Sequence, residues 1–246
     1  DSDISDIKKA EQIIRNQNDD IKDSILYAKR IQNAILPTEE YISTFLDNYF
    51  ILNIPRDIVS GDFYWISKVD DVIIFAAADC TGHGVPGAFM SLLGITYLSE
   101  LNDAIILNRI SPAQALEKLR SKIKISLKQT GKDDESQDGI DMALCFYDST
   151  SKILEYAGAH SPVFLFRNSN QLLEIKPDRQ PVGIYLKESP FTNHNIKIET
   201  GDCIYLFSDG YKDQPGGELS KKFNFKRFKD LFNTIHNLPM NEQKQI

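Results

Sequence analysis

Apolar residues between positions 49 and 208 fall into short runs separated by turn residues. The runs are rich in β-branched and aromatic residues, a pattern typical of β-strands. Two longer stretches with helical spacing interrupt them, at residues 86–105 and 111–130, and a third helix is predicted near residues 225–235. The predicted strand segments are YFILNI, FYWISKV, VIIFAAA, IDMALCFY, ILEYAGA, VFLFR, IKIE and CIYLFS.

The connections between these segments predict how the strands pack. Tight turns predict antiparallel pairing of neighbouring strands, whereas continuous apolar runs predict strands that are covered on both faces. Two stacked, mostly antiparallel sheets with helices outside satisfy both patterns, so we expect an α+β fold. Phe63, Tyr64 and Trp65 are expected to pack in the core and along a hairpin.

Residues 4–36 differ from the rest, because they are polar, helix-forming and free of Gly and Pro. Apolar residues recur there every seven positions, a spacing typical of a coiled-coil seam, and Pro37 ends the helix. We therefore divide the chain into an N-terminal linker helix, residues 1–37, and a globular domain, residues 38–246. The helix either packs its stripe on its own domain or dimerises and transmits a signal from upstream. The stripe consists of Ile7, Ile14, Ile21, Ala28 and Ile35.

Composition limits the partners and the compartment. The 246 residues carry a net charge of −7 and no long run of Lys or Arg, so nucleic acid is not an expected partner. Cys80, Cys145 and Cys203 are far apart and lack the spacing of a zinc site or a disulfide framework, which fits a reducing cytoplasm. The longest apolar run, VIIFAAA, is far shorter than the roughly 20 residues that cross a bilayer. Because the sequence starts without methionine, we expect a cytoplasmic segment of a larger protein with an upstream sensor domain.

The segment SGDFYWISKVDDVIIFAAADC predicts a hairpin with a two-residue Asp-Asp loop between Val69 and Val72. The same register places Asp62 opposite Asp79. Directly opposed side chains share a sheet face, with Cβ atoms roughly 4.5–5.5 Å apart, and like charges there are destabilising unless something neutralises them. The pair therefore predicts a cation site, unless the loop has another length or the aspartates turn toward water.

Other aspartates occupy similar positions. The segment CIYLFSDGYKDQ leads Asp209 into a glycine turn, and QDGIDMALCFY places Asp138 and Asp141 at the start of an apolar strand. Carboxylates without clustered Cys or His select hard cations, Mg²⁺ or Mn²⁺ before Zn²⁺. Two such ions roughly 3.5–4 Å apart activate a bridging water for in-line phosphoryl displacement. The pattern favours a phosphoester hydrolase, although Asp-Gly is also ordinary turn chemistry.

Six motifs, in this order and spacing, resemble the SpoIIE/RsbU-like branch of the metal-dependent PPM (protein phosphatase 2C) serine/threonine phosphatases. They are IVSGDFYW, ADCTGHGVPGAFMSLLG, DGIDMALCFYD, EYAGAHSPVFLFR, PVGI and GDCIYLFSDGYKDQ. The likeness runs from about Ile31 to Phe228, and AKRIQNAILP resembles the segment that joins such domains to upstream regulators. The resemblance implies an α-β-β-α sandwich with a two-metal Mn²⁺ or Mg²⁺ centre between the sheets. It also implies removal of phosphate from phosphoserine or phosphothreonine of a protein.

The resemblance assigns roles to five residues by match of motif. Asp79 would bridge both metals, the backbone carbonyl of Cys80 would bind one of them, and Asp209 would bind the other. Asp62 would act nearby, directly or through water, and Asp141 matches an aspartate that helps to hold a metal. Asp62, Asp79 and Asp209 are thus the expected catalytic residues. Family members usually end in a strand preceded by an Asp pair, which the terminal NEQKQI does not contain, so we expect an incomplete second metal site or a final strand beyond it.

Two further residues are candidates for substrate binding. His83, between two glycines, could protonate a leaving group or fix a metal-bound water, or it could simply fill a tight turn. Arg56, six residues before Asp62, could bind the substrate phosphate through two hydrogen bonds, or it could be an ordinary surface arginine.

The leading hypothesis is a protein phosphatase that acts without a covalent enzyme intermediate. The resemblance suggests a small signalling protein of the anti-sigma-antagonist type as the phosphorylated substrate. It also suggests that the N-terminal helix regulates the enzyme by forming a homodimer and repositioning the metal ligands. One alternative is a catalytically degenerate phosphatase fold that binds or scaffolds a phosphoprotein, and another is a metal hydrolase of small phosphoesters.

Overall fold

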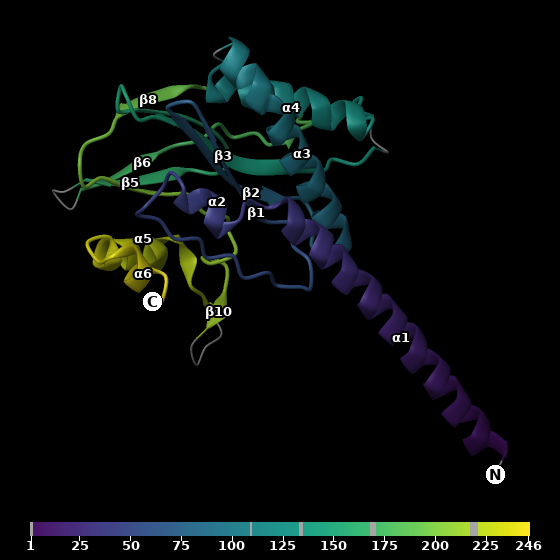
Figure 1. Cartoon of the computed structure of the whole chain (residues 1–246). Coiled ribbons are helices and arrows are strands. Elements are labelled where there is room, and N and C mark those ends of the chain that lie inside the picture. The colour runs from purple at the N-terminus through teal and green to yellow at the C-terminus, as the bar shows by residue number, and fades with distance from the viewer. Residues whose placement is uncertain (1, 109, 133–134, 168–170, 217–220) are drawn as a thin grey trace.

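The computed structural model of the chain describes residues 2–108, 110–132, 135–167, 171–216 and 221–246 (Figure 1). Its helices are α1 (Ser2–Ile35), α2 (Glu39–Ser43), α3 (Gly84–Asn108), α4 (Pro112–Ser126), α5 (Asn224–Ile235) and α6 (Met240–Gln243). Its strands are β1 (Phe63–Val69), β2 (Val72–Cys80), β3 (Gly139–Asp148), β4 (Ile153–Ala159), β5 (Val163–Arg167), β6 (Gln171–Ile175), β7 (Val182–Gly183), β8 (His194–Lys197), β9 (Cys203–Tyr205), β10 (Pro215–Gly216) and β11 (Lys221–Lys222). The three helices predicted within the globular domain correspond to α3, α4 and α5.

The strands form two main sheets. The larger sheet has the order β1-β2-β3-β4-β8, with β7 paired to β3, and the smaller sheet has the order β6-β5-β9. β10 and β11 form a separate hairpin. Neighbouring strands pair antiparallel in both sheets. The antiparallel pairing predicted from the tight turns is therefore confirmed.

Successive side chains along a strand point to opposite faces of the sheet, so the core consists of three apolar clusters between the layers of helices and sheets. On one face of the larger sheet, Leu144 of β3 packs among residues of α3 and α4. On the other face, Cys145 meets Leu165 of the smaller sheet. The outer face of the smaller sheet packs on α5 through Phe164. The layers form an α-β-β-α sandwich (Figure 1), so the predicted fold class is confirmed.

Residues 49–54 are an exception, because YFILNI forms no strand. Leu52 and Ile54 are 47% and 80% exposed, and Phe50 packs against the aromatic cluster of α5. An apolar run forms a strand only where a neighbouring strand supplies backbone partners, and no described strand pairs with this one. The prediction of a strand was therefore wrong here, and the pattern also did not reveal α2, α6, β6, β7, β10 and β11.

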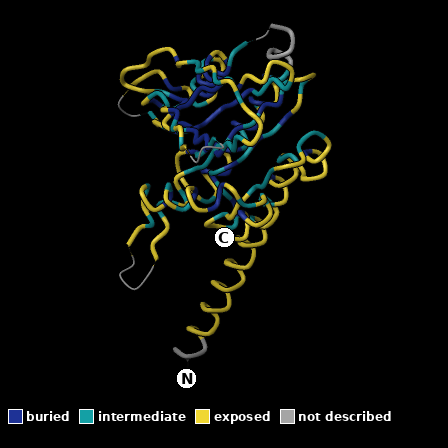
Figure 2. The backbone as a smooth tube through the Cα atoms, turned by 90° about the vertical axis from the view of Figure 1, so that its left-hand side faces the viewer, coloured by how far each residue is buried: buried dark blue, intermediate teal, exposed yellow. Residues whose placement is uncertain are grey.

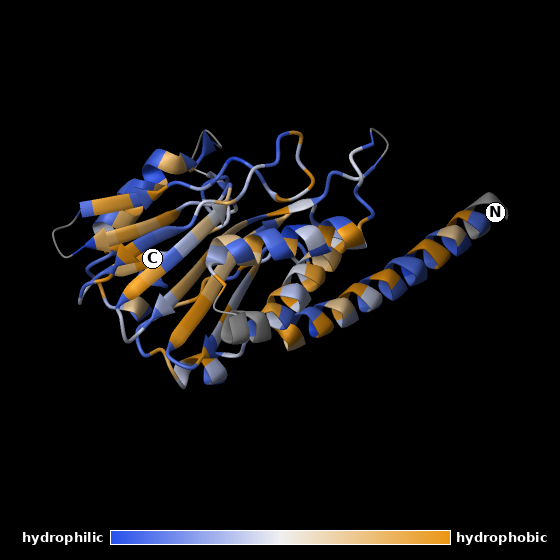
Figure 3. Ribbon diagram, turned by 90° about the horizontal axis from the view of Figure 1, so that it is seen from above, coloured by the Kyte–Doolittle hydropathy of each residue, from blue (hydrophilic) through white to orange (hydrophobic). Residues whose placement is uncertain are grey.

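α1 extends away from the sandwich, and Figure 2 shows most of its length exposed. Ile7, Ile14 and Ile21 of the heptad stripe are 58%, 56% and 59% exposed. Figure 3 shows apolar positions recurring along α1 toward its free end. Only the C-terminal part of α1 meets the domain, where it lies beside α3 and buries Gln32. Packing on the chain's own domain therefore covers only the C-terminal end of the heptad stripe, and only in part, while the rest of the stripe stays exposed.

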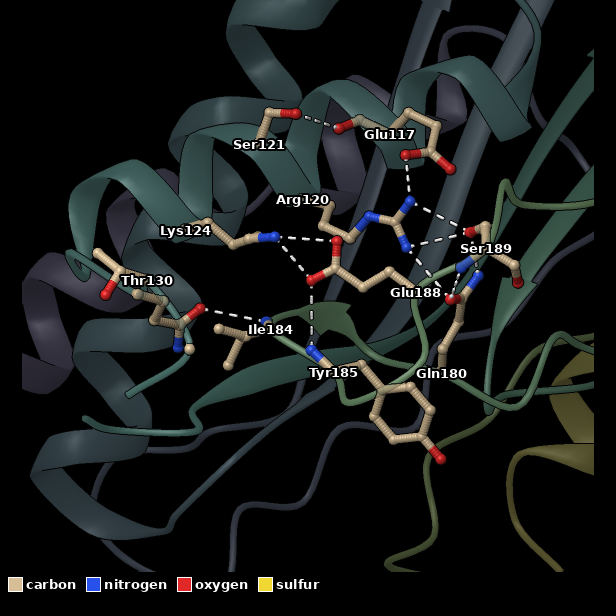
Figure 4. A network of polar contacts seen from close by, with 12 residues as sticks. Glu117, Arg120, Ser121, Lys124, Thr130, Gln180, Ile184, Tyr185, Glu188 and Ser189 are labelled. Carbon is tan, nitrogen blue, oxygen red and sulfur yellow. Dashed lines mark hydrogen bonds and ion pairs between the residues drawn. The ribbon is translucent and has the colours of Figure 1, made fainter. Parts of the chain in front are cut away.

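A polar network attaches the chain around β7 to α4 (Figure 4). Buried Arg120 donates to the side chain of Gln180 and to the carbonyl of Ser189, at 3.2 Å each, and forms an ion pair with Glu117. Gln180 and Ser189 also bond to each other twice, at 2.7 and 2.9 Å. Because β7 lies between these two residues in the chain, the network holds β7 against the start of β3. The PVGI motif contains β7 and therefore stabilises the end of β3 that carries Asp141.

Cys80, Cys145 and Cys203 are free thiols, as predicted. Burial raises the pKa of Cys145 above the ordinary range, so this thiol stays protonated. None of the described helices combines the length and the apolar character needed to cross a membrane.

Candidate active site

Three aspartates lie across the ends of β1, β2 and β3. Asp79 of β2 is the direct backbone partner of Asp141 of β3. The β1–β2 hairpin has the predicted register, which runs up to the pair of Phe63 and Ala78. Asp62 directly precedes Phe63, and its carboxyl lies within hydrogen-bonding reach of the Asp79 carboxyl. The sequence prediction that Asp62 and Asp79 lie together is confirmed.

Asp209 joins this row from a distant part of the chain. β9 ends at Tyr205, and the following turn brings the Asp209 carboxyl within hydrogen-bonding reach of Asp79. Asp138, another aspartate predicted near a strand end, instead accepts a hydrogen bond from Ser136 Oγ in the loop before β3. We refer to Asp62, Asp79, Asp141 and Asp209 as the aspartate cluster.

Crowding and burial change the protonation of the aspartate cluster. Burial, followed by the carboxylates of Asp62 and Asp209, raises the pKa of Asp79 to about 8. Burial also raises the pKa of Asp141, although the hydrogen bond with His160 opposes the rise. A carboxyl with a pKa near 8 keeps its proton at neutral pH unless a positive charge takes the place of the proton. The negative charge of the aspartate cluster is therefore not balanced by cationic side chains of the described residues, and a bound cation could replace the proton on Asp79.

Three polar side chains that the sequence analysis did not assign to the site hold the cluster. Ser208 Oγ donates to Asp62 at 2.6 Å, and Lys212 Nζ lies 3.9 Å from Asp209 Oδ2. His160 Nδ1 lies 2.9 Å from Asp141 Oδ1. Ser208 and Lys212 stand in the same motif as Asp209, which was the signal that could have found them. His160 directly follows β4, and the β3–β4 register, which pairs Met142 with Ala159, brings it opposite Asp141, so this hairpin was the signal that could have found it.

Close backbone packing shapes the same end of the sheet. A Cβ atom added at Gly61 would lie 2.8 Å from the carbonyl oxygen of Gly82 and 3.2 Å from that of Cys80. A Cβ atom at Gly87 would lie 2.5 Å from the Gly82 oxygen. Glycine alone fits at positions 61 and 87 without a shift of the backbone. These contacts place the Cys80 carbonyl beside the segment that leads into Asp62.

Gln32 connects α1 to that segment. Its Nε2 donates to the Ser60 carbonyl at 2.6 Å and to Ser91 Oγ at 2.8 Å, and its Oε1 accepts from the Ser60 N–H at 3.1 Å. The crevice beside it holds only about 10 Å³ of free space, room for about one water. Because Ser60 precedes Asp62 by two residues, the side chain links α1 to the backbone that carries Asp62. The sequence analysis missed this role, since a glutamine in a polar helix has no distinguishing pattern.

Two predicted substrate-binding residues do not join the aspartate cluster. His83 is exposed, and its Nδ1 lies 3.2 Å from Asp57 Oδ2. Arg56 is exposed as well and forms no ion pair with a carboxylate of the described residues. Contact of either residue with a phosphate stays a prediction.

The residues present fit a divalent-cation centre by charge and donor chemistry. The cluster offers carboxylate oxygens and a nearby carbonyl, ligands that suit Mg²⁺ or Mn²⁺ better than Zn²⁺. Burial and then the neighbouring carboxylates of Asp62 and Asp209 raise the pKa of Asp79, and a bound cation would offset both effects. Within the described ranges, no three His, Cys, Asp or Glu side chains already surround one common cation position.

The fold and the aspartate cluster define a PP2C-type phosphatase domain. The SiaA-PP2C domain of Pseudomonas aeruginosa is 30% identical in sequence and has a TM-score of 0.82, over 93% of this chain and 88% of that domain. The PP2C domain of Bacillus subtilis SpoIIE, solved with a fragment of its regulatory domain, shares the fold. It is 18% identical, with a TM-score of 0.57, over 76% of this chain and 51% of that one.

Within this class, the family model described as stage II sporulation protein E (SpoIIE) matches residues 70–245, so the chain belongs to the SpoIIE family. The phosphoserine phosphatase RsbU of Bacillus subtilis (strain 168) is 26% identical over 201 residues, 81% of this chain. The chain spans 56% of the length of RsbU. The resemblance to the SpoIIE/RsbU-like branch of the PPM phosphatases is therefore confirmed.

Proposed function

We propose that this chain is a metal-dependent protein phosphatase that removes phosphate from phosphoserine or phosphothreonine of a signalling protein. The observation that carries the proposal is the aspartate cluster, in which burial and two neighbouring carboxylates raise the pKa of Asp79 to about 8. Such a concentration of carboxylates at the end of a buried sheet is destabilising unless cations bind there. The similarity to RsbU, a phosphoserine phosphatase, supports the activity.

The cluster would hold two divalent cations, Mn²⁺ or Mg²⁺. Asp79, which lies within reach of both Asp62 and Asp209, is the proposed bridging ligand. The Cys80 carbonyl is the proposed ligand of one cation, and Asp209 that of the other. Asp62 would act directly or through water, and Asp141 would complete the set. Asp62, Asp79 and Asp209 are the proposed catalytic residues.

When bound, the two cations supply an activated water and neutralise charge on the phosphoryl oxygens. The chain's own polar groups orient the carboxylates for this task. Ser208 fixes one oxygen of Asp62 and His160 fixes one oxygen of Asp141, so their second oxygens stay available. Lys212, beside Asp209, supplies a positive charge at the edge of the cluster. His83 and Arg56 are retained as proposed substrate contacts, His83 to protonate the leaving group or fix a metal-bound water and Arg56 to bind the phosphate.

The proposed substrate is a phosphorylated protein of the anti-sigma-antagonist type, which the family resemblance supports. Two alternatives predict different behaviour. A degenerate binding module would bind phosphopeptide without turning it over, and a hydrolase of small phosphoesters would prefer nucleotides or sugar phosphates to phosphopeptides.

The first experiment measures phosphate release from a phosphoserine peptide, an aryl phosphate and a nucleotide during titration with Mn²⁺. We expect manganese-dependent turnover of the peptide, which Asp79→Asn abolishes. Asp71→Asn is the matched control, because it removes the same charge from the exposed hairpin turn. Peptide binding without turnover at any Mn²⁺ or Mg²⁺ concentration would favour the binding module instead. Turnover of the nucleotide alone would favour the small-phosphoester hydrolase.

We further propose that residues 1–37 are a linker helix that dimerises, and that residues 38–246 form the phosphatase domain. The exposed heptad stripe of α1 supports pairing with a second copy, because a coiled-coil seam buries such residues. The hydrogen bonds of Gln32 to Ser60 give a route by which movement of α1 reaches Asp62. An upstream sensor domain in a longer protein would act through this helix.

Sedimentation velocity at several protein concentrations tests the dimer. We expect reversible dimerisation that Ile14→Asp weakens. Gln12→Asp, which adds the same charge on the opposite face of α1, should leave it unchanged. A protein that is monomeric at every concentration removes the dimer from the proposal and leaves the phosphatase activity untouched.

A further inference from the structure

A hollow of about 340 Å³ is lined by Tyr211, which follows Asp209 of the aspartate cluster by two residues. Its walls come from the turn after Asp209, from the β10–β11 hairpin and from the first turn of α5. Figure 1 shows this hairpin projecting from the body of the domain next to α5. The volume is within the range of small-ligand sites. The lining residues include Tyr211, Gln214, Pro215, Lys221, Phe223 and Arg227.

The hollow has an aromatic floor. The Tyr211 ring contacts the rings of Phe223 and Phe228, with centroids 5.5 and 5.3 Å apart. Backbone hydrogen bonds from Phe223 to Gln214 and from Asn224 to Lys212, at 2.9 and 2.8 Å, close the base of the hairpin. A floor fixed in this way can hold the aliphatic part of a bound side chain or peptide.

The walls of the hollow are cationic, although the chain as a whole carries a net charge of −7. Lys212 and Lys222, which do not line the hollow, are engaged by Asp209 and Asp213, at 3.9 and 3.0 Å. Lys221 and Arg227 are exposed, and neither forms an ion pair with a carboxylate of the described residues. An anionic group that lay on the aromatic floor would meet both cations.

We propose that this hollow binds an acidic segment of the phosphoprotein substrate, next to the residue that carries the phosphate. This inference rests on the proposed phosphatase function and deepens it. A negatively charged substrate has to approach a cluster of carboxylates, so a cationic contact beside that cluster raises its local concentration and sets its orientation. A carboxylate of the segment pairs with Lys221 and Arg227, and its aliphatic stem lies on Tyr211.

The position of the hollow sets the spacing of the acidic residue. Tyr211 follows Asp209 by two residues, so the Cα atoms of these two residues lie within about 7 Å of each other. An extended peptide advances about 3.3 Å per residue. The bound carboxylate therefore belongs to a residue about two to four positions from the phosphoserine.

Two phosphoserine peptides of identical length test this assignment. One carries Glu at the positions two to four residues from the phosphoserine, and the other carries Gln there. We expect Lys221→Gln with Arg227→Gln to raise KM for the Glu peptide about tenfold, since two exposed charge pairs are lost, with kcat unchanged. The Gln peptide and an aryl phosphate should be unaffected. Lys226→Gln removes a neighbouring exposed cation outside the hollow and is the matched control.

Charge reversal gives a second, independent readout. Arg227→Glu should weaken the Glu peptide further and favour a peptide with Lys at the same positions. Equal KM values for the Glu and Gln peptides on the unmodified protein, or equal losses on both in the variants, overturn the inference.

Binding separates this inference from the phosphatase proposal. If no substrate is turned over, fluorescence anisotropy of a labelled Glu peptide still measures occupancy of the hollow, and its loss in the double variant supports the inference. No binding of that peptide overturns it. A single-stranded oligonucleotide that competes as well as the Glu peptide would also overturn it, because the hollow would then recognise phosphate backbones.

Discussion

Replacing Asp79 by Asn should stabilise the metal-free protein while removing its activity. Asn has nearly the same shape and no charge, so it ends the repulsion from Asp62 and Asp209. In the folded chain the pKa of Asp79 is about 8, compared with an ordinary value of 3.8. A raised carboxyl pKa means that the folded state holds a proton that the unfolded chain releases. The contribution of Asp79 to the free energy of unfolding is therefore most favourable below pH 4 and falls as the pH rises toward 8.

The size of the effect follows from the same shift. Each pKa unit corresponds to about 1.4 kcal/mol. Asp79 is only partly buried and solvent screens its charge, so only a fraction of the full shift contributes to stability. We expect Asp79→Asn to raise the free energy of unfolding by about 2 kcal/mol at pH 8. For a domain of this size, that gives a rise of about 4–8 °C in Tm.

Thermal unfolding in EDTA, followed by circular dichroism at pH 5 and pH 8, measures the effect. We expect Asp79→Asn to be clearly more stable than the unmodified protein at pH 8, and the difference to shrink at pH 5. Saturating Mn²⁺ should reverse the order, because it stabilises only the protein that retains the ligand. Asp71→Asn, at the exposed turn, should track the unmodified protein. Equal Tm values for Asp79→Asn and the unmodified protein at pH 8 in EDTA would refute the argument that crowded, buried carboxylates destabilise the metal-free protein.

Two further substitutions test how the site is supported. Gln32→Ala removes the hydrogen bonds to Ser60 and Ser91 and should lower the free energy of unfolding by about 2–3 kcal/mol, with weaker Mn²⁺ activation. Urea titration checks the stability, and a loss below about 0.5 kcal/mol would show that the link is unimportant. Gly87→Ala places a Cβ atom 2.5 Å from the Gly82 oxygen and should cost about 1–3 kcal/mol together with most activity. Gly216→Ala, where an added Cβ atom meets nothing within 4 Å, should leave the same unfolding curve unchanged.

Much of the fold could be predicted from local pattern. Continuous apolar runs and tight turns identified the long strands of the larger sheet, because a strand that is covered on both faces carries apolar residues at successive positions. The two-residue loop fixed the hairpin register, and the register alone placed Asp62 beside Asp79. The heptad stripe likewise identified α1. The pattern failed at residues 49–54, where Phe50 packs from a loop and no described strand pairs with this segment.

The site could be predicted only where its residues share a hairpin or a motif. Asp62 and Asp79 are linked by one turn, so their proximity is a local property of the sequence. The contact of Ser208 with Asp62 spans 146 positions, and the contact of Gln32 with Ser60 spans 28. Such contacts depend on how the two sheets and α1 stack, which no spacing rule encodes.

Sequence by itself therefore determined the class of fold, the position of the linker helix and the aspartates of the site. The tertiary structure decided which aspartates converge, since it separated Asp138 from the cluster and brought in Asp209. It also decided which polar groups hold them, and it created the cationic hollow beside Asp209. The physical reason is that strand pairing and turns act between neighbours in the chain. Burial, charge crowding and pocket shape arise only when distant segments meet.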